Sequence, residues 1–504
     1  MNIKGDVTGG LTAGIIALPL ALAFGIASGL GASAGLWGAL VLGFFAAIFG
    51  GTKMQISGPT GPMSVVAAAI VFNFKGDMGS VMAVFVLTGI FQIIFGVLKL
   101  GKFVKYIPYS VISGFMSGVG FIIILLQINP MLGSSSVGNT LSAIESIPQA
   151  IADINFTAFY FAVATLLILY LTPKKISRIL PTPLLAIIVL TSLCMILKAD
   201  VATIGEIPLG LPKFIVPNAD MALMSSILLY ALMLAVLGSI DSLLTSLVAD
   251  SITKSKHSPN KELIGQGIGN AFVGFVGGIP GAGATMRTVA NIKAGGEGRI
   301  SGVVHALFLL FVALVFAPVV AYVPLCVLAG ILIKVGIDIL DYRLLKRIAF
   351  IPRKDATTMA IVFLLTVFVD LIFAVAIGVV LAWLFYSTNI PKRNKKFNIT
   401  VCEEEEFKSV KITGPMYFGT SSKIMRNLNR NLNTKHIKID CRKVTFMDIS
   451  SVYALEDFID SVDENATKVS IIIDERSFSG RSLNELKYIL RDNIDPTFAE
   501  NDDE

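Results

Sequence analysis

A single carboxylate interrupts a long apolar stretch of this chain. Asp241 lies in the sequence Leu237-Gly238-Ser239-Ile240-Asp241-Ser242-Leu243-Leu244-Thr245. On a helix, the hydroxyl of Thr245 is on the same face as the carboxylate four residues earlier. An ionisable side chain at membrane depth is costly and indicates a functional site. We therefore expect Asp241 and Thr245 to bind sodium, which accepts such oxygen ligands; the alternatives are a carboxylate that carries a proton and a structural Asp bonded to backbone.

Two stretches rich in glycine and proline also interrupt apolar sequence. They are residues 57–62, Ser-Gly-Pro-Thr-Gly-Pro, and residues 278–288, Gly-Ile-Pro-Gly-Ala-Gly-Ala-Thr-Met-Arg-Thr. At membrane depth, non-helical backbone is tolerated only where it is buried in protein or lines a water-filled cavity. Each stretch leads into a helix-compatible segment, residues 63–72 and 286–294, so each exposes the free N–H groups of a helix N-terminus. Such an arrangement attracts an anion.

Three side chains on or near these segments have two interpretations each. Thr60 offers its hydroxyl to an anion, to the helix that follows as an ordinary N-cap, or to both. Arg287 either adds positive charge to the anion site or lies at the cytoplasmic interface, paired with Glu297 or lipid phosphate. Phe24 either forms a wall of the cavity or only packs against neighbouring helices.

The elements that carry these residues have the composition of a membrane protein. The 504 residues are 54% hydrophobic and 15% charged, with a mean hydropathy of +0.76. Between residues 6 and 386 we count about fourteen apolar runs of transmembrane type, two of them short and preceded by the broken stretches. The breaks occupy comparable positions in two halves of about seven spans, which predicts an inverted repeat with a shared site near mid-membrane. The amino-terminal run lacks a charged leader and a cleavage site, so we interpret it as the first membrane helix.

The net charge of +6 is distributed over alternate loops and does not indicate a nucleic-acid partner. Under the positive-inside rule the basic loops are cytoplasmic, and an even number of spans places both termini in the cytoplasm. We therefore expect a multi-pass protein of the cell (inner) membrane, surrounded by lipid. Four scattered cysteines and three histidines predict neither a disulfide framework nor a zinc site. The sequence contains no Walker A, HExxH or GxSxG motif, so an enzyme is not expected, and no cofactor is expected beyond a coupling ion.

Composition changes abruptly at residues 389–396, which we interpret as a linker after a membrane domain of residues 1–388. Residues 397–492 alternate short β-like runs (409–412, 436–440, 469–473) with helix-compatible segments (421–432, 450–463, 483–491). This alternation predicts a small α/β domain on the cytoplasmic side. The acidic residues 493–504 are expected to be disordered.

These features resemble the sulfate permease (SulP) family of anion transporters over nearly the whole chain. The resemblance rests on residues 57–63, on Gly283-Ala284-Thr285 and on a trailing segment that looks like a STAS domain. Within the family, residues 17–25, 261–267 and 281–286 are most similar to the cyanobacterial sodium-dependent bicarbonate transporters. The resemblance implies an anion between the third and tenth spans and sodium beside the eighth. The expected anion-site residues are Thr60, Gly61, Ala284, Thr285, Arg287 and Phe24, and the expected sodium ligands are Asp241, Thr245, Gly283 and Thr285.

Three positions depart from the patterns of this family. Arg287 stands where the bicarbonate group can have a small residue and other anion carriers have Arg. Leu20 stands where sulfate carriers tend to have Gln. In the STAS-like segment Asp448 is followed by Ile449, and not by the Ser or Thr of phosphorylated STAS domains, so a phosphorylation switch is not expected.

The function that these observations favour is secondary active transport of a small inorganic anion, with sodium-coupled bicarbonate uptake first. The alternatives are a proton- or sodium-coupled sulfate or dicarboxylate transporter, and an anion channel or STAS-linked sensor, which would not need Asp241. A homodimer that forms through the STAS domain is the expected assembly.

Overall fold

The computed structural model divides the chain into two compact units. The first contains Met1–Val104 and Val119–Ile339, and the second contains Lys105–Gly118 and Leu340–Glu504. The structure describes residues 2–472 except for 103–106, 138, 178–179, 206–209, 213, 219–220, 254, 350, 370, 390–396, 404–407, 431–435 and 463–467. All but the first residue of the expected linker at 389–396, together with the expected helix at 483–491 and the acidic tail at 493–504, therefore lie outside the described residues. The expected domain boundaries remain predictions.

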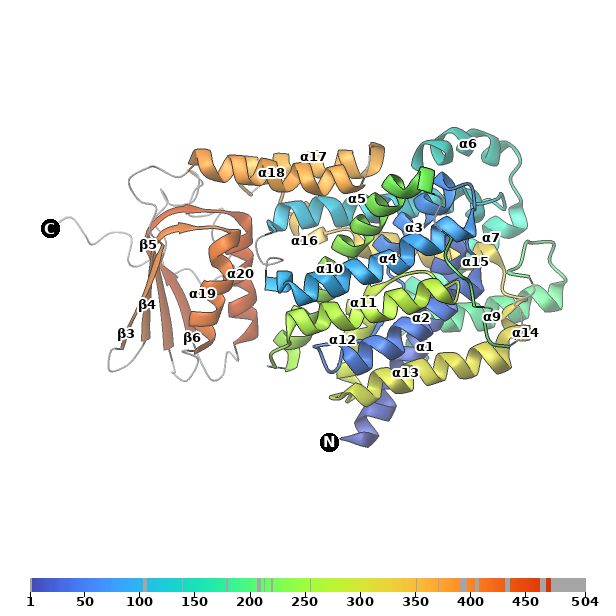
Figure 1. Cartoon of the computed structure of the whole chain (residues 1–504), viewed down its shortest axis with the longest axis horizontal. Coiled ribbons are helices and arrows are strands. Elements are labelled where there is room, and N and C mark those ends of the chain that lie inside the picture. The colour runs from blue at the N-terminus through green and yellow to red at the C-terminus, as the bar shows by residue number, and fades with distance from the viewer. Residues whose placement is uncertain are drawn as a thin grey trace. The chain divides into compact units, whose positions relative to one another are not determined.

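The first unit is almost entirely helical (Figure 1). Its helices, in chain order, are α1 (Ile3–Ala27), α2 (Ala32–Phe49), α3 (Gly61–Asn73), α4 (Met78–Val97), most of α5 (Tyr109–Met131), α6 (Thr140–Ala152), α7 (Phe156–Leu171), α8 (Lys174–Ser177), α9 (Thr182–Leu197), α10 (Met224–Thr253), α11 (Pro259–Phe275), α12 (Thr285–Lys293), α13 (Arg299–Phe311), α14 (Ala317–Val320) and α15 (Leu325–Ile339). A 3₁₀ turn, Met221–Leu223, precedes α10, and a π-helical turn, Val312–Phe316, joins α13 to α14.

Within the described residues, six helices are long and apolar enough to cross a membrane, or seven if the bent pair α6 and α7 is one span. Shorter apolar helices, among them α3 and α9, add to these. The helical membrane architecture expected from composition is confirmed. The total of about fourteen spans remains a prediction, and α3 and α12, with 13 and 9 residues, are the two short helices expected after the broken stretches.

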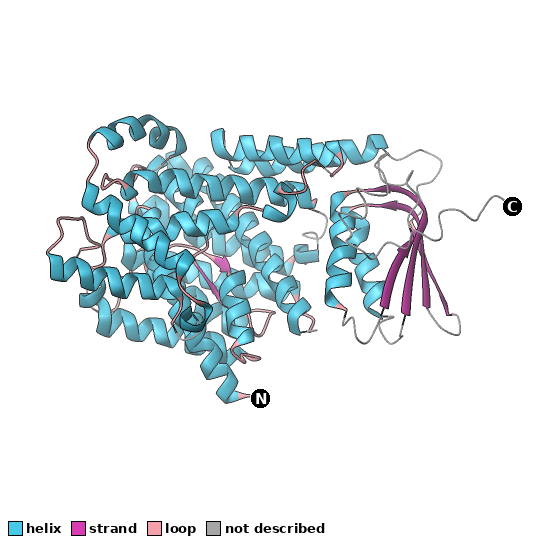
Figure 2. Cartoon of the chain, turned by 180° about the vertical axis from the view of Figure 1, so that it is seen from behind, coloured by secondary structure: helices cyan, strands magenta, loops and turns pink. Residues whose placement is uncertain are grey.

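Two pairs of strand residues lie among these helices (Figure 2). They are β1 (Ser57–Gly58) and β2 (Ala282–Gly283), and both come from the stretches rich in glycine and proline. Prolines cannot donate a backbone hydrogen bond, so Pro59 and Pro280 favour extended chain over a continuous helix. Each strand is followed within a few residues by a helix, as the sequence predicts: α3 and α12 begin close to the expected residues 63 and 286.

The second unit contains α16 (Tyr342–Leu345), α17 (Arg353–Phe368) and α18 (Leu371–Asn389), followed by a four-stranded sheet. The strands are β3 (Asn398–Glu403), β4 (Lys408–Met416), β5 (His436–Met447) and β6 (Lys468–Ile472), in that spatial order. β3 and β4 are antiparallel, whereas β4, β5 and β6 are parallel. The expected strands β4, β5 and β6 are confirmed, and β3 is a strand that the sequence interpretation missed.

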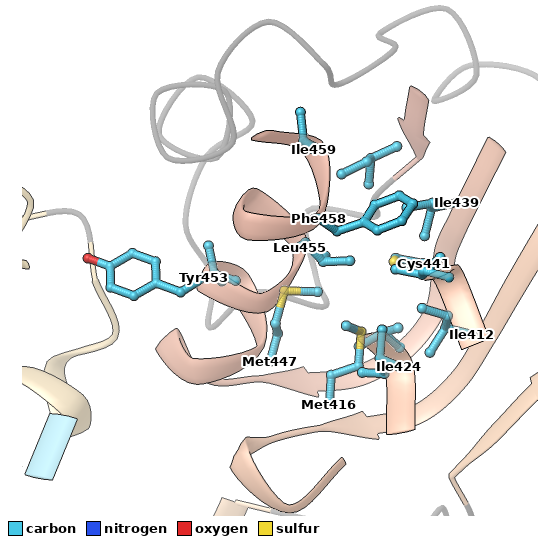
Figure 3. Packing of buried hydrophobic residues seen from close by; sticks show 14 of the residues in the cluster. Ile412, Met416, Ile424, Ile439, Cys441, Met447, Tyr453, Leu455, Phe458 and Ile459 are labelled. Atoms are coloured by element: carbon cyan, nitrogen blue, oxygen red, sulfur yellow. The ribbon is translucent and has the colours of Figure 1, made fainter. Parts of the chain in front are cut away.

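Helices α19 (Phe418–Arg430) and α20 (Ile449–Ser461) cover one face of this sheet (Figure 2). Leu455 and Phe458 of α20 point toward Ile439 and Cys441 of β5 (Figure 3). Asp448 begins α20 as its N-cap and accepts the N–H of Ser451 at 2.9 Å. The α/β domain expected after residue 397 therefore has an apolar core of its own.

We expect residues from Phe397 onward, expressed alone, to unfold in one cooperative transition, because the sheet and its two helices supply most of one apolar core. The isolated segment should be less stable than the same residues in the full chain, since Leu344, Ile351 and Met359 also pack into this core. Chemical denaturation followed by circular dichroism measures both. A gradual loss of signal without a transition would show that the segment is not an independent domain.

Candidate functional site

The two broken stretches meet in space as an antiparallel pair. Ser57 faces Gly283, and Gly58 faces Ala282. Because the strands are antiparallel, α3 and α12, which follow them, start next to each other and run in opposite directions. Both N-termini, with their unpaired N–H groups and positive dipole ends, therefore lie beside the pair formed by β1 and β2. We call this pair the strand crossing. This is the geometry expected of two inverted halves that share one site.

Thr60 occupies the N-cap position of α3, but its hydroxyl makes no capping hydrogen bond. Its side chain is buried, and Oγ1 has no partner among the described residues. The capping interpretation of this hydroxyl is therefore wrong. A buried hydroxyl without a partner is costly, so this hydroxyl is suited to bind a ligand.

The residues expected to bind a cation come together beside β2. The Thr245 hydroxyl donates to the Gly283 carbonyl oxygen at 2.9 Å, and its Oγ1 lies 2.7 Å from Oγ1 of Thr285. Asp241 is one helical turn before Thr245 on α10, is half-buried, and has a buried Oδ2 that makes no hydrogen bond to any residue the structure describes. Its carboxylate lies beside the Thr60 hydroxyl and within electrostatic range of Arg287. Three oxygen-bearing groups, those of Thr245, Gly283 and Thr285, thus meet at the start of α12, where Thr285 is exposed, and Asp241 lies one helical turn away on α10.

Arg287 is buried, with 2% of its surface exposed. Its Nη2 donates to the carbonyl oxygen of Pro59, whereas Nε and Nη1 have no hydrogen-bond partner in the described part of the chain. A Cβ atom at position 58 would lie 2.6 Å from Nη1, so glycine leaves the space that the guanidinium occupies. The alternative position of Arg287 at the cytoplasmic interface, paired with Glu297, is therefore wrong.

Phe24 and Gly61 both line a small cavity at the start of α3. Ser64, Gln127 and Leu332 contribute to the same wall, together with Ala27, Val65, Ile123 and Leu126. The cavity is mostly apolar with a few polar side chains, as in sites for small ligands. Phe24 therefore lines this cavity, and its role as a wall of the anion site remains a prediction. Ala284, the N-cap residue of α12, is buried at the strand crossing and donates its N–H to the Ile56 carbonyl oxygen at 2.8 Å.

The sequence interpretation missed a line of polar residues on α11. Glu262, Gln266 and Asn270 are spaced by four residues, so they lie on one face of the helix, and each is at most 1% exposed. We call these three residues the α11 ladder. Their spacing in a helix that is otherwise rich in glycine and apolar residues was visible in the sequence and could have identified them.

The α11 ladder contacts both broken stretches. Gln266 donates through Nε2 to the Ser57 hydroxyl at 2.6 Å. Asn270 accepts the Gly281 N–H at 2.9 Å and donates to the Gly281 carbonyl oxygen at 3.0 Å. The ladder thereby satisfies backbone groups that non-helical chain would otherwise leave unpaired inside the membrane domain.

Comparison with known protein families decides what kind of membrane protein carries this site. Residues 3–362 match the model of the sulfate permease family, and residues 398–473 match the model of the STAS domain. The chain belongs to the sulfate permease family. The resemblance noted from the sequence, the helical transporter fold and the C-terminal STAS domain are thus confirmed. Members of this family are multi-pass membrane transporters of anions, and this chain is one of them.

Two cyanobacterial relatives are similar over most of their length. Both are described as bicarbonate transporter BicA. The protein of Picosynechococcus sp. (strain ATCC 27264 / PCC 7002 / PR-6) is 41% identical over 97% of this chain and 92% of its own length. The protein of Synechocystis sp. (strain ATCC 27184 / PCC 6803 / Kazusa) is 42% identical over 88% of this chain and 83% of its own length. A putative sulfate transporter of Bacillus subtilis (strain 168), YvdB, is 33% identical over 87% of this chain and 85% of its own.

Solved structures agree with this family assignment. The transmembrane domain of a cyanobacterial bicarbonate transporter BicA is 46% identical, with a TM-score of 0.71, and the match covers 74% of this chain and 98% of that domain. The structure of SLC26A9 matches 98% of this chain and 88% of its own with a TM-score of 0.71 at 19% identity, which supports the fold alone.

Proposed function

We propose that this protein is a secondary active transporter that takes up bicarbonate together with sodium. The observation that supports it most strongly is the adjacency of an anion-attracting and a cation-attracting group of residues. The N-termini of α3 and α12 follow one pair of strands, the oxygens of Thr245, Gly283 and Thr285 meet at the start of α12, and Asp241 lies one helical turn before Thr245. A cation and an anion bound side by side lower each other's cost of desolvation, so each favours binding of the other.

In this proposal the anion binds against Thr60, Gly61, Ala284 and Thr285, with Phe24 as a wall. Helix N-termini offer N–H donors that suit the oxygens of a small oxyanion. The two unpaired guanidinium nitrogens of Arg287 add a positive charge that is already present before sodium binds. The similarity to two proteins described as bicarbonate transporters favours bicarbonate among the oxyanions.

A second candidate is coupled transport of sulfate or a dicarboxylate, and Arg287 favours it because other anion carriers of the family resemble this chain in having Arg at this position. With Asp241 ionised, the charges of Asp241 and Arg287 cancel, and one sodium ion then neutralises one bicarbonate. A dianion would need a second cation, either sodium or a proton. The similarity to a putative sulfate transporter agrees with this candidate. An anion channel or a STAS-linked sensor is less favoured because neither needs the oxygens around Asp241.

The remaining assignments follow from the same proposal. The protein lies in the cell (inner) membrane with both termini in the cytoplasm, as the distribution of basic loops indicates. It forms a homodimer, with the STAS domain as the contact between subunits.

Counterflow uptake into proteoliposomes that contain the purified full-length protein tests the substrate and the coupling ion together. Labelled bicarbonate, sulfate and fumarate are compared with and without sodium, at alkaline pH so that little bicarbonate converts to carbon dioxide. We expect sodium-dependent uptake of bicarbonate that exceeds that of the two dianions. Uptake that is independent of sodium but increases with an inward proton gradient would show that the coupling ion is the proton. Preferential uptake of sulfate or fumarate would show that bicarbonate is not the main substrate.

A further inference from the structure

Glu262 is the charged member of the α11 ladder, and its four hydrogen bonds all come from N–H donors. Oε2 accepts the backbone N–H groups of Gly51 and Thr52, both at 2.8 Å. Oε1 accepts the side-chain amides of Gln55 at 2.9 Å and Gln266 at 2.8 Å. A protonated carboxyl group would have to turn its own O–H toward one of these donors. The ionised form is therefore the one that fits this buried position.

The negative charge determines which way the two neighbouring amides point. Gln55 turns Nε2 to Glu262, which leaves its Oε1 to accept the Ser246 hydroxyl at 2.8 Å. Gln266 also turns Nε2 to Glu262, and the same nitrogen reaches the Ser57 hydroxyl at 2.6 Å. If the side chain at position 262 were uncharged and offered an N–H instead, the amides of Gln55 and Gln266 would lose the acceptor that fixes their orientation.

Both oriented amides contact the strand crossing at the same pair of residues. Gln55 packs directly on Gly283, where a Cβ atom would lie 2.1 Å from Nε2 of Gln55. Gln266 binds Ser57, and Ser57 is the residue of β1 that faces Gly283 of β2. The carbonyl oxygen of Gly283 in turn accepts the hydroxyl of Thr245. A continuous series of contacts therefore joins Glu262 to the proposed cation ligands.

We propose that Glu262 is a positioning residue of the transport site. Its fixed charge orients Gln55 and Gln266, and these two amides hold Gly283 and Ser57 at the geometry that the coupling cation requires. The proposal rests on the proposed function, because Gly283 and Thr245 are ligands of sodium only there. In this proposal Glu262 contacts neither the sodium ion nor the transported anion, and acts only through Gln55 and Gln266.

The substitution Glu262→Gln tests the charge at almost unchanged volume. Its new NH₂ group must face either the two backbone N–H groups or the amides of Gln55 and Gln266. In the second case Gln55 has to turn round, which directs its NH₂ at Ser246, and Gln266 loses its hydrogen bond to Ser57. The first arrangement sets the NH₂ group against two backbone N–H groups, which disfavours it. The second therefore applies, and it displaces the strand crossing on its cation side.

The experiment compares sodium affinity with anion affinity in proteoliposomes that contain the full-length protein. For Glu262→Gln we expect the sodium concentration for half-maximal bicarbonate uptake to increase at least tenfold, while the KM for bicarbonate at saturating sodium stays within threefold. Glu297→Gln, the same substitution at an exposed residue of the same unit, should change neither value. The double variant Glu262→Gln, Gln55→Glu returns one carboxylate that accepts from both the new amide and Ser246, so it should recover much of the sodium affinity.

Wild-type sodium affinity in Glu262→Gln would overturn the proposal. So would an equal loss of sodium and bicarbonate affinity that the double variant does not restore, since that indicates general damage to the fold. If Glu262→Gln yields no folded protein, the double variant decides, and an unfolded double variant also overturns the proposal. If wild-type uptake ignores sodium, the coupling proposal fails by itself. The role of Glu262 is then tested by the maximal rate of bicarbonate uptake. In Glu262→Gln this rate must be at least tenfold below that of the wild type, while the KM for bicarbonate stays within threefold of the wild-type value. The double variant must restore the rate.

Discussion

Asp241→Asn is expected to abolish accumulation of the anion against its gradient while the protein remains folded. Asparagine keeps the size of the side chain and its hydrogen-bonding capacity but removes the charge that attracts a cation at the start of α12. Without that charge, sodium loses its only fully charged ligand in the proposed set, and the sodium gradient no longer drives uptake. Sodium-driven accumulation of labelled bicarbonate in proteoliposomes measures this effect.

Two further variants make the result specific. Asp153→Asn, the same substitution at an exposed residue after α6, should accumulate the anion normally. Thr245→Ala should increase the sodium requirement without creating a dependence on pH, because it removes an oxygen that sodium uses and a proton does not. Full accumulation by Asp241→Asn would show that Asp241 has no role in coupling.

The second large effect is expected for the hydroxyls of Thr60 and Thr285. Thr60→Ala and Thr285→Ala each remove a hydrogen bond to a charged ligand, which is worth about 1.5–3 kcal/mol. This corresponds to a loss of roughly tenfold or more in affinity for the anion. The larger loss is expected for Thr60, because Thr60 is buried whereas Thr285 is exposed and its hydroxyl already lies 2.7 Å from the Thr245 hydroxyl.

Substrate affinity in each variant is measured as the KM for bicarbonate at saturating sodium. Thr165→Ala provides the matched control, because Thr165 is buried on α7 and its hydroxyl is bonded to the Phe161 carbonyl oxygen of the same helix. The proposed position of the anion is wrong if neither Thr60→Ala nor Thr285→Ala changes the KM.

Local chemistry explains which parts of this site were predictable. The starts of α3 and α12 follow from prolines and glycines within a few residues of each helix, so the sequence predicted both to within two residues. The same holds for the shared face of Asp241 and Thr245, which depends only on helical spacing. These features involve the chain within one or two turns.

The features that sequence reasoning missed depend on contacts between distant segments. Whether Arg287 faces the site is determined by the space beside Gly58, which comes from the other half of the chain. The role of Glu262 depends on residues 51–55, more than 200 positions earlier. β3 was missed because Asn398–Glu403 is a short edge strand next to a run of acidic residues, and its pairing with β4 outweighs its weak pattern.

The strand crossing also constrains the order in which the protein is made. β1 pairs with β2, and the N–H of Ile56 is bonded to the Thr288 hydroxyl, 232 residues later in the chain. Until the ribosome has delivered that second segment, the backbone at residues 56–58 has no permanent partners inside the lipid, where water cannot replace them. The helices that precede residue 282 must therefore remain loosely packed, or bound to an insertion factor, until the second segment has been inserted into the membrane. A nascent chain that stops before residue 282 should be a substrate for membrane quality control, however hydrophobic its completed spans are.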